Sequence, residues 1–219
     1  THSLTQHTHC ICGKTDCDDT SVGHSILEKK GVVYKAFDGT DEIEYDANNC
    51  AYIALPRDVT LSNSLGKEGA TLYICLNGHK LSSSNLEAPI INNLKNLVIC
   101  DCVGTGEIGN RGTDDSPAVQ AINIANDCNV YVYGGSIANN ITNSNGAGVL
   151  LGDSASFYMY GGSVKNNKTT QNGGGISVQP SSSGGVYLYN GEISDNSAVN
   201  GGGIYFDNGY NFNMSGWRN

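Results

Sequence analysis

A repeated segment in the second half of the chain constrains the fold more than any other feature. Residues 130–137 (VYVYGGSI), 157–164 (FYMYGGSV) and 186–193 (VYLYNGEI) align with one another, and residues 212–217 (FNMSGW) open a fourth copy. A short segment that recurs at a nearly constant spacing is typical of a solenoid, in which each copy adds one coil to a stack. The sequence therefore predicts stacked coils.

The period within each copy decides between helical coils and coils of strands. In each copy one apolar residue lies between two tyrosines, as Val132 does between Tyr131 and Tyr133. A period of two puts the apolar side chain on one face and the tyrosines on the other, which is the pattern of a strand. Glycine pairs and triplets separate these runs, where the chain must turn. We expect an all-β, single-stranded parallel β-helix (solenoid), with the right-handed winding that parallel crossovers favour.

The same frame can be followed upstream through apolar residues that we expect to face the lumen. These anchor residues are Ile74, Ile99, Val132, Met159, Leu188 and Met214. The step from Ile99 to Val132 is longer than the other steps, which predicts an insertion in that coil, most simply the loop at residues 111–117.

Three segments follow from this frame. We expect a small Cys/His-rich cap segment at residues 1–30, a β-rich amino-terminal cap of the solenoid at 31–71, and parallel β-helix coils at 72–219. The open apolar end of a solenoid must be covered, which is the role we assign to the cap. The sequence stops partway through a repeat, so we expect a fragment of a longer protein or a last coil covered by another copy. End-to-end self-association through that coil is the corresponding partner prediction.

Composition narrows the class of partner and the compartment. The 219 residues carry a formal net charge of -9, which disfavours nucleic acid and anionic membranes as partners. No apolar run reaches membrane-spanning length, so we expect no membrane insertion. Eight cysteines in a chain of this size indicate an oxidising compartment and predict a secreted or cell-surface protein.

The amino-terminal segment is dense in cysteine and histidine. Residues 9–13 (HCICG) have the H-x-x-C-G form of a zinc knuckle, in which a tight glycine turn lets two ligands converge. The candidate ligands of a structural zinc are His9, Cys12, Cys17 and His24. The alternative is a cap tied by disulfides, in which Cys10, Cys12 and Cys17 pair with one another or with Cys50.

Two further cysteines share one column of the predicted solenoid. Cys75 and Cys100 each follow an anchor isoleucine, so they lie on adjacent coils at a separation that a disulfide can bridge. We take Cys75 and Cys100 as the candidate disulfide, with Cys102 as a competing partner. Cys50 and Cys128 have no assigned partner, because spacing alone does not determine connectivity.

The tyrosines of the repeat form two columns on the outer face. The candidate ligand-binding residues are Tyr131, Tyr133, Tyr158, Tyr160, Tyr187 and Tyr189. A flat aromatic surface edged with hydroxyls suits stacking against sugar rings. The alternative is that identical rings stack on one another along the solenoid and stabilise it without a ligand.

An asparagine recurs eight residues after the central apolar residue of each copy. These are Asn140, Asn167 and Asn196. We expect an amide ladder at a corner of the coil, with each side chain bonded to its neighbour or to a turn backbone.

Several motifs resemble known surface-protein repeats. Residues 173–176 (GGGI) and 200–204 (NGGGI) resemble the GG-x-I repeat of polymorphic outer-membrane proteins and right-handed β-helix adhesins. Residues 7–13, 75–79 and 100–106 resemble the amino-terminal region of repeat-bearing surface proteins of Gram-positive gut bacteria. The resemblance implies an exported, adhesive protein with a right-handed β-helix and supplies no catalytic residues.

The leading functional prediction is a non-catalytic extracellular adhesin or structural spacer that binds host or dietary glycans or a host surface protein. A polysaccharide lyase or glycoside hydrolase is an alternative, because such enzymes also use parallel β-helices. Its candidate carboxylates are Asp101, Glu107, Asp114 and Asp115. A self-assembling surface or filament subunit is a further alternative.

Overall fold

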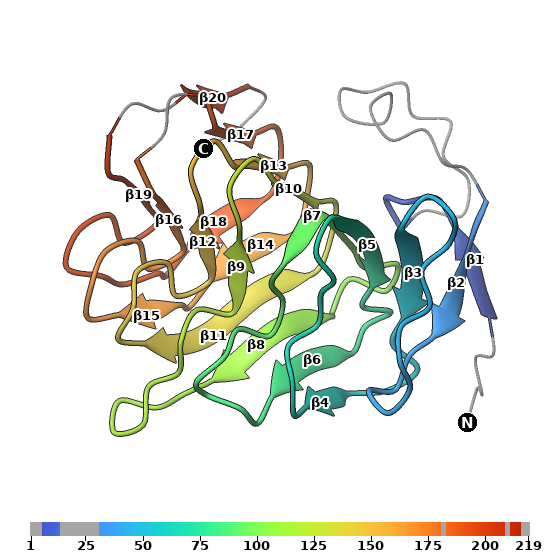
Figure 1. The fold of residues 1–219 in the computed structure, drawn as a ribbon. Helices are drawn as coiled ribbons and strands as arrows, with labels where there is room; N and C mark the ends of the chain where they lie inside the picture. Colours follow the sequence, from blue (N-terminus) through green and yellow to red (C-terminus); the bar gives the residue numbers. More distant parts are fainter. Residues whose placement is uncertain (1–5, 14–30, 181–182, 209–210, 216–219) are drawn as a thin grey trace.

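The chain folds as a parallel β-solenoid of about five turns (Figure 1). The computed structural model describes residues 6–13, 31–180, 183–208 and 211–215. All regular structure in these residues is β, which confirms the predicted all-β solenoid. None of the described residues belongs to a helix long and apolar enough to cross a membrane.

Three sheets form the faces of the solenoid. The nine-stranded sheet has, in spatial order, β1 (Gln6–His9), β2 (Val32–Ala36), β3 (Cys50–Ala54), β5 (Ala70–Cys75), β7 (Leu94–Cys100), β10 (Asn129–Val132), β13 (Ser156–Met159), β17 (Gly185–Leu188) and β20 (Asn211–Met214). The seven-stranded sheet has β18 (Glu192–Ser194), β14 (Ser163–Lys165), β11 (Ser136–Thr142), β8 (Glu107–Arg111), β6 (Lys80–Ser83) and β4 (Val59–Leu61), with β15 (Lys168–Thr169) also paired to β11. The four-stranded sheet has β19 (Ile204–Phe206), β16 (Ile176–Val178), β12 (Val149–Leu151) and β9 (Ile122–Ile124). Every pairing except that of β1 with β2 is parallel, as stacked coils require.

The predicted column of anchor residues exists in the nine-stranded sheet. Successive register partners along it are Ile74, Ile99, Val132, Met159, Leu188 and Met214. Met159 is fully buried in the lumen, whereas Met214 in the last described strand is 53% exposed. The apolar lumen is therefore well packed through the middle coils and opens toward β20.

The predicted insertion lies where the sequence placed it. Arg111 and Ala118 are seven residues apart, whereas their partners Asn140 and Thr142 in the next coil are two apart. The earlier coil therefore holds five extra residues between Arg111 and Ala118, which include a turn closed between Thr113 and Ser116.

The same coil contains a second insertion that sequence analysis did not identify. Ile99 and Glu107 are eight residues apart, whereas their partners Val132 and Ser136 are four apart. Four extra residues therefore lie in the loop at residues 100–106, which carries Cys102.

Coil geometry begins within the segment assigned to the amino-terminal cap. β3 pairs in parallel with β5 and places Ile53 opposite Ile74, so Ile53 extends the anchor column. β4 pairs in the same way with β6, with Val59 opposite Leu81. The short strands of this region lack the tyrosine pattern of the later coils, and only their register shows that they belong to the stack.

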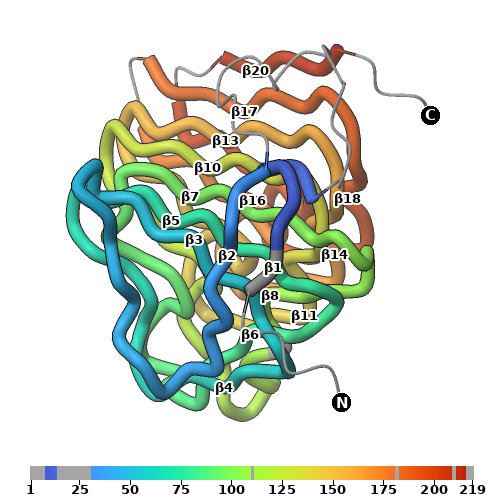
Figure 2. Tube along the Cα trace, turned by 90° about the vertical axis from the view of Figure 1, so that its right-hand side faces the viewer, coloured from blue at the N-terminus to red at the C-terminus, as the bar shows by residue number. Residues whose placement is uncertain are grey.

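The first two strands of the nine-stranded sheet turn away from the stack and cross the outer face of later strands of the same sheet (Figure 2). β1, the turn at residues 10–13 and β2 form the amino-terminal ribbon, whose strands pair antiparallel. β2 joins the parallel stack only through Lys35 and Ala36, so the rest of the ribbon lies over the outer face of β5, β7 and β10. Tyr34 of the ribbon is fully buried there.

This ribbon creates a second apolar core outside the solenoid lumen. Its buried members are Ile11, Tyr34, Ala54, Tyr73, Cys75, Val98, Cys100 and Tyr131. The two-sided burial explains why residues 72–76 (LYICL) and 97–100 (LVIC) are unbroken apolar runs, since a strand covered on both faces does not alternate.

The asparagine ladder is confirmed at a corner of the coil. Asn140 Nδ2 donates to Asn167 Oδ1 at 2.8 Å, and Asn167 Nδ2 donates to Asn196 Oδ1 at 3.0 Å. The residue before each ladder asparagine has a positive φ: Asn139 at 59°, Asn166 at 54° and Asp195 at 53°. Asn and Asp tolerate this left-handed conformation, which turns the chain and aims the following amide at the neighbouring coil.

Candidate functional site

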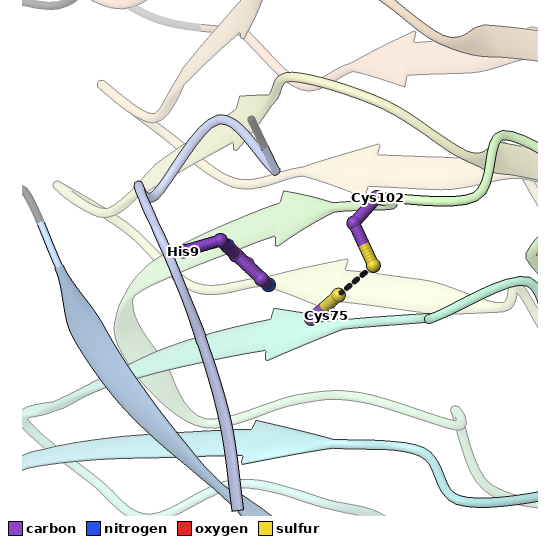
Figure 3. Close-up of side chains that lie close together, drawn as sticks. All are labelled: His9, Cys75 and Cys102. Carbon is purple, nitrogen blue, oxygen red and sulfur yellow. Dashed lines mark hydrogen bonds between the residues drawn. The ribbon is translucent and has the colours of Figure 1, made fainter. Parts of the chain in front are cut away.

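Three side chains from the ribbon and two coils converge beneath the amino-terminal ribbon (Figure 3). His9 ends β1, Cys75 ends β5, and Cys102 lies two residues beyond β7. One potential ligand atom from each lies within 4.8 Å of the corresponding atoms of the other two. We call these three residues the Cys/His cluster.

The orientation of His9 is set by two contacts. Its ring stacks on Tyr34 with centroids 4.4 Å apart, and the side chain is 2% exposed. Its Nδ1 donates to the carbonyl oxygen of Cys10. A carbonyl only accepts, so Nδ1 carries a proton, and in the neutral form of the ring the lone pair lies on Nε2.

The inserted loop positions Cys102 through the carboxylate of Asp101. Asp101 accepts hydrogen bonds from the backbone amides of Gly78 at 2.8 Å, Val103 at 3.2 Å and Gly106 at 2.6 Å. The ribbon packs directly on this loop, because a Cβ on Gly13 would lie 3.2 Å from the backbone of Asp101. Asp101 therefore stabilises the conformation of the loop that carries Cys102.

The two sulfurs of the cluster are close but not bonded. Cys75 Sγ lies 3.6 Å from Cys102 Sγ, whereas a disulfide bond is about 2.05 Å long. Hydrogen bonding with the Cys100 thiol, together with burial, raises the pKa of Cys75 above its ordinary value. The Cys100 thiol also lies 3.9 Å from the hydroxyl of Tyr34.

The structure brings one predicted zinc ligand together with two cysteines that were not predicted as ligands. His9 is in the cluster, and Cys12 lies half-buried in the turn beside it. Cys17 and His24 lie outside the described residues. The signal that could have identified Cys102 is the C-x-C spacing at residues 100–102, which matches that at residues 10–12.

The predicted column of cysteines is present. Cys75 and Cys100 are register partners on adjacent parallel strands. Both thiols are reduced in the structure, so a disulfide between them stays a prediction.

The six candidate tyrosines form two stacked stripes on the outer face of β10, β13 and β17. The rings of Tyr131, Tyr158 and Tyr187 stack at centroid distances of 4.9 and 4.8 Å. The second stripe contains Tyr133, Tyr160 and Tyr189, at 5.0 and 4.9 Å. This spacing equals the distance between strands, so the rings stack along the solenoid axis.

The stacking determines which ring faces a ligand can reach. Tyr158 and Tyr160 each have a tyrosine on both faces and present only edges and hydroxyls. At the other end Tyr131 is 8% exposed, because it belongs to the core under the ribbon. The flat aromatic surface expected from the sequence is therefore restricted to the ends of the stripes at Tyr187 and Tyr189.

Burial changes the ionisation of the tyrosines. It raises the pKa of Tyr131 to about 12 and also raises the pKa of Tyr133, Tyr160 and Tyr187. These hydroxyls therefore remain neutral donors at neutral pH. The Tyr160 hydroxyl is buried and has no hydrogen-bond partner among the described residues.

Three of the four candidate carboxylates of a glycan-cleaving enzyme, Asp101, Glu107 and Asp114, have separate structural partners. Asp114 forms an ion pair with Lys168 at 2.6 Å, and Glu107 accepts a hydrogen bond from Asn139 at 2.9 Å. Arg111, the basic residue in this loop, is 2% exposed and donates to the carbonyl oxygens of Asn85 and Ala88.

Comparisons with family models, with curated proteins and with solved structures find no match to this chain. The likeness to surface-protein repeats therefore rests on the quoted motifs alone.

Proposed function

We propose that this protein is a non-catalytic extracellular surface protein, an adhesin or spacer, that binds a glycan at the ends of its two tyrosine stripes. One observation carries the proposal. Among the described residues, the last rings, Tyr187 and Tyr189, each stack on a tyrosine on one side only, and the next strand brings short polar side chains to the other side.

The polar side chains beside these rings are Asn213 and Ser215. Asn213 lies opposite Tyr187, and the Ser215 amide bonds to the Leu188 carbonyl, which places Ser215 next to Tyr189. Both polar residues are exposed. Sugar sites combine an aromatic face for the apolar side of the ring with short donors and acceptors for its hydroxyls, and this set supplies both.

The rest of the stripes supports such a site. Stacking at the strand spacing holds the rings rigidly, so little conformational entropy is lost when a ligand binds.

The extracellular assignment draws on sequence features. Eight cysteines favour an oxidising compartment, and the acidic charge disfavours nucleic acid and anionic membranes. The motif resemblance to exported surface proteins points the same way, and a solenoid is a suitable rigid spacer.

A glycan array with the wild-type chain tests this function, followed by titration of each positive glycan against alanine variants. We expect Tyr187→Ala and Tyr189→Ala each to weaken binding about tenfold, from the loss of one aromatic contact. Tyr205→Ala is the matched control, because Tyr205 is a partly buried tyrosine on the four-stranded sheet. Absence of any glycan signal, or equal binding by all three variants, would contradict the proposal.

A further inference from the structure

We propose that His9, Cys75 and Cys102 bind a zinc ion that fastens the amino-terminal ribbon to the outer face of the solenoid. Their potential ligand atoms lie within 4.8 Å of one another. Two thiolates and an imidazole are ligands that zinc prefers, and three protein ligands leave a position for a fourth. The proposal does not depend on glycan binding at the tyrosine stripes.

The separation of the two sulfurs fits a shared metal. Cys75 Sγ and Cys102 Sγ are 3.6 Å apart. Two sulfurs held by one tetrahedral zinc, at about 2.3 Å each, lie about 3.8 Å apart. A disulfide would require both sulfurs to approach to about 2.05 Å, so the geometry is closer to that of a metal pair.

The histidine has the environment of a metal ligand. Its Nδ1 donates to the Cys10 carbonyl, so in the neutral ring Nε2 is the nitrogen that carries the lone pair and would ligate a metal. Metal-binding histidines commonly donate their second nitrogen to a carbonyl or a carboxylate, because that bond sets the tautomer and the ring orientation. Stacking on Tyr34 further restricts rotation of the ring.

Both cysteines are held by separate parts of the solenoid. Cys75 lies at the end of a central strand and is fully buried. Cys102 lies in the four-residue insertion, which Asp101 fixes through three backbone amides. The insertion thus brings a second thiol to the place where the ribbon delivers His9.

A metal at this position would strengthen the attachment of the ribbon to the solenoid. The ribbon shares only two register pairs with the parallel stack, at Lys35 and Ala36, yet it covers the outer face of several coils. A bond from His9 to two coils ties the far end of the ribbon to the solenoid. Removal of the metal should therefore loosen the ribbon and leave the coils intact.

The test uses the full chain, purified without chelator and with its thiols kept reduced. We expect about one equivalent of zinc per chain by elemental analysis, and thiolate-to-metal charge-transfer bands when cobalt(II) replaces it. Alkylation should reach Cys75 and Cys102 only after a chelator is added, and protease should then cut the ribbon before it cuts the coils.

Variants locate the site. His9→Gln, Cys75→Ser and Cys102→Ser should each lose the zinc, whereas the control Cys128→Ser should retain it, because Cys128 donates instead to the Asn126 carbonyl. The cobalt spectrum and the alkylation pattern are measured on the wild-type chain, so they test for the metal site even if a variant misfolds. Three results would overturn the proposal: a Cys75–Cys102 disulfide in the reduced preparation, no uptake of zinc or cobalt(II), or zinc retained by both His9→Gln and Cys102→Ser.

Discussion

Removal of the middle rung of the asparagine ladder should destabilise the solenoid strongly. The Asn167 side chain accepts hydrogen bonds from the backbone amide of Asn140 at 3.3 Å and from Asn140 Nδ2 at 2.8 Å. It also donates to the Ile137 carbonyl and to Asn196 Oδ1, both at 3.0 Å. Asn167→Ala therefore removes four hydrogen bonds at a fully buried position.

The expected cost is about 4 kcal/mol, because a typical intramolecular hydrogen bond contributes about 1 kcal/mol net. That is a large share of the 5–15 kcal/mol, roughly, by which a domain is stable. Asn200→Ala is the matched control: Asn200 is exposed and its Nδ2 makes one bond, to Asn172 Oδ1 at 2.9 Å. We expect that control to cost about 0.5 kcal/mol or less.

Equilibrium urea unfolding of both variants and the wild type, followed by circular dichroism, measures the two costs. The comparison is made at equal m values, so that both differences refer to the same unfolding transition. If Asn167→Ala cost no more than Asn200→Ala, the ladder would not stabilise the coils and the reasoning would be refuted.

Two further predictions follow from the lumen and from the tyrosines. Met159→Ala should lower the free energy of unfolding by about 2–5 kcal/mol, because it leaves a buried cavity. Met214→Ala, in the same column but at a side chain that is 53% exposed, should lower it far less. Equal urea midpoints for the two variants would contradict the packing. Burial raises the folded-state pKa of Tyr131 to about 12 from its ordinary value of 10.0. The contribution of the neutral Tyr131 side chain to stability is therefore complete below pH 10 and is lost as the pH rises toward 12. Unfolding free energies measured across this range should decline, less steeply for Tyr131→Phe; a flat profile in the wild type would argue against the burial.

The lumen and the corners of the coils could be predicted because they depend on interactions that repeat. An apolar residue between two tyrosines specifies which side chains enter the lumen, and identical spacing then places Val132, Met159 and Leu188 in one column. The ladder follows from the same spacing, because each asparagine meets an identical partner one coil away.

The Cys/His cluster could be predicted only in part. The local H-x-x-C-G pattern identified His9, but the thiols that join it come from positions 75 and 102. Which outer face the ribbon covers depends on packing between segments far apart in the chain, and no local period encodes that choice. The unbroken apolar run at residues 72–76 is the sequence feature that indicates burial of this strand on both faces.

The sequence by itself determined the winding of strands, the register of the coils and the ladder, since each of these requires only that one coil match the next. The tertiary structure alone decided where the ribbon lies, which tyrosine faces are covered, and which sulfurs meet His9. Those features are contacts between unlike segments, and their energy depends on shape and burial in three dimensions rather than on any repeated spacing.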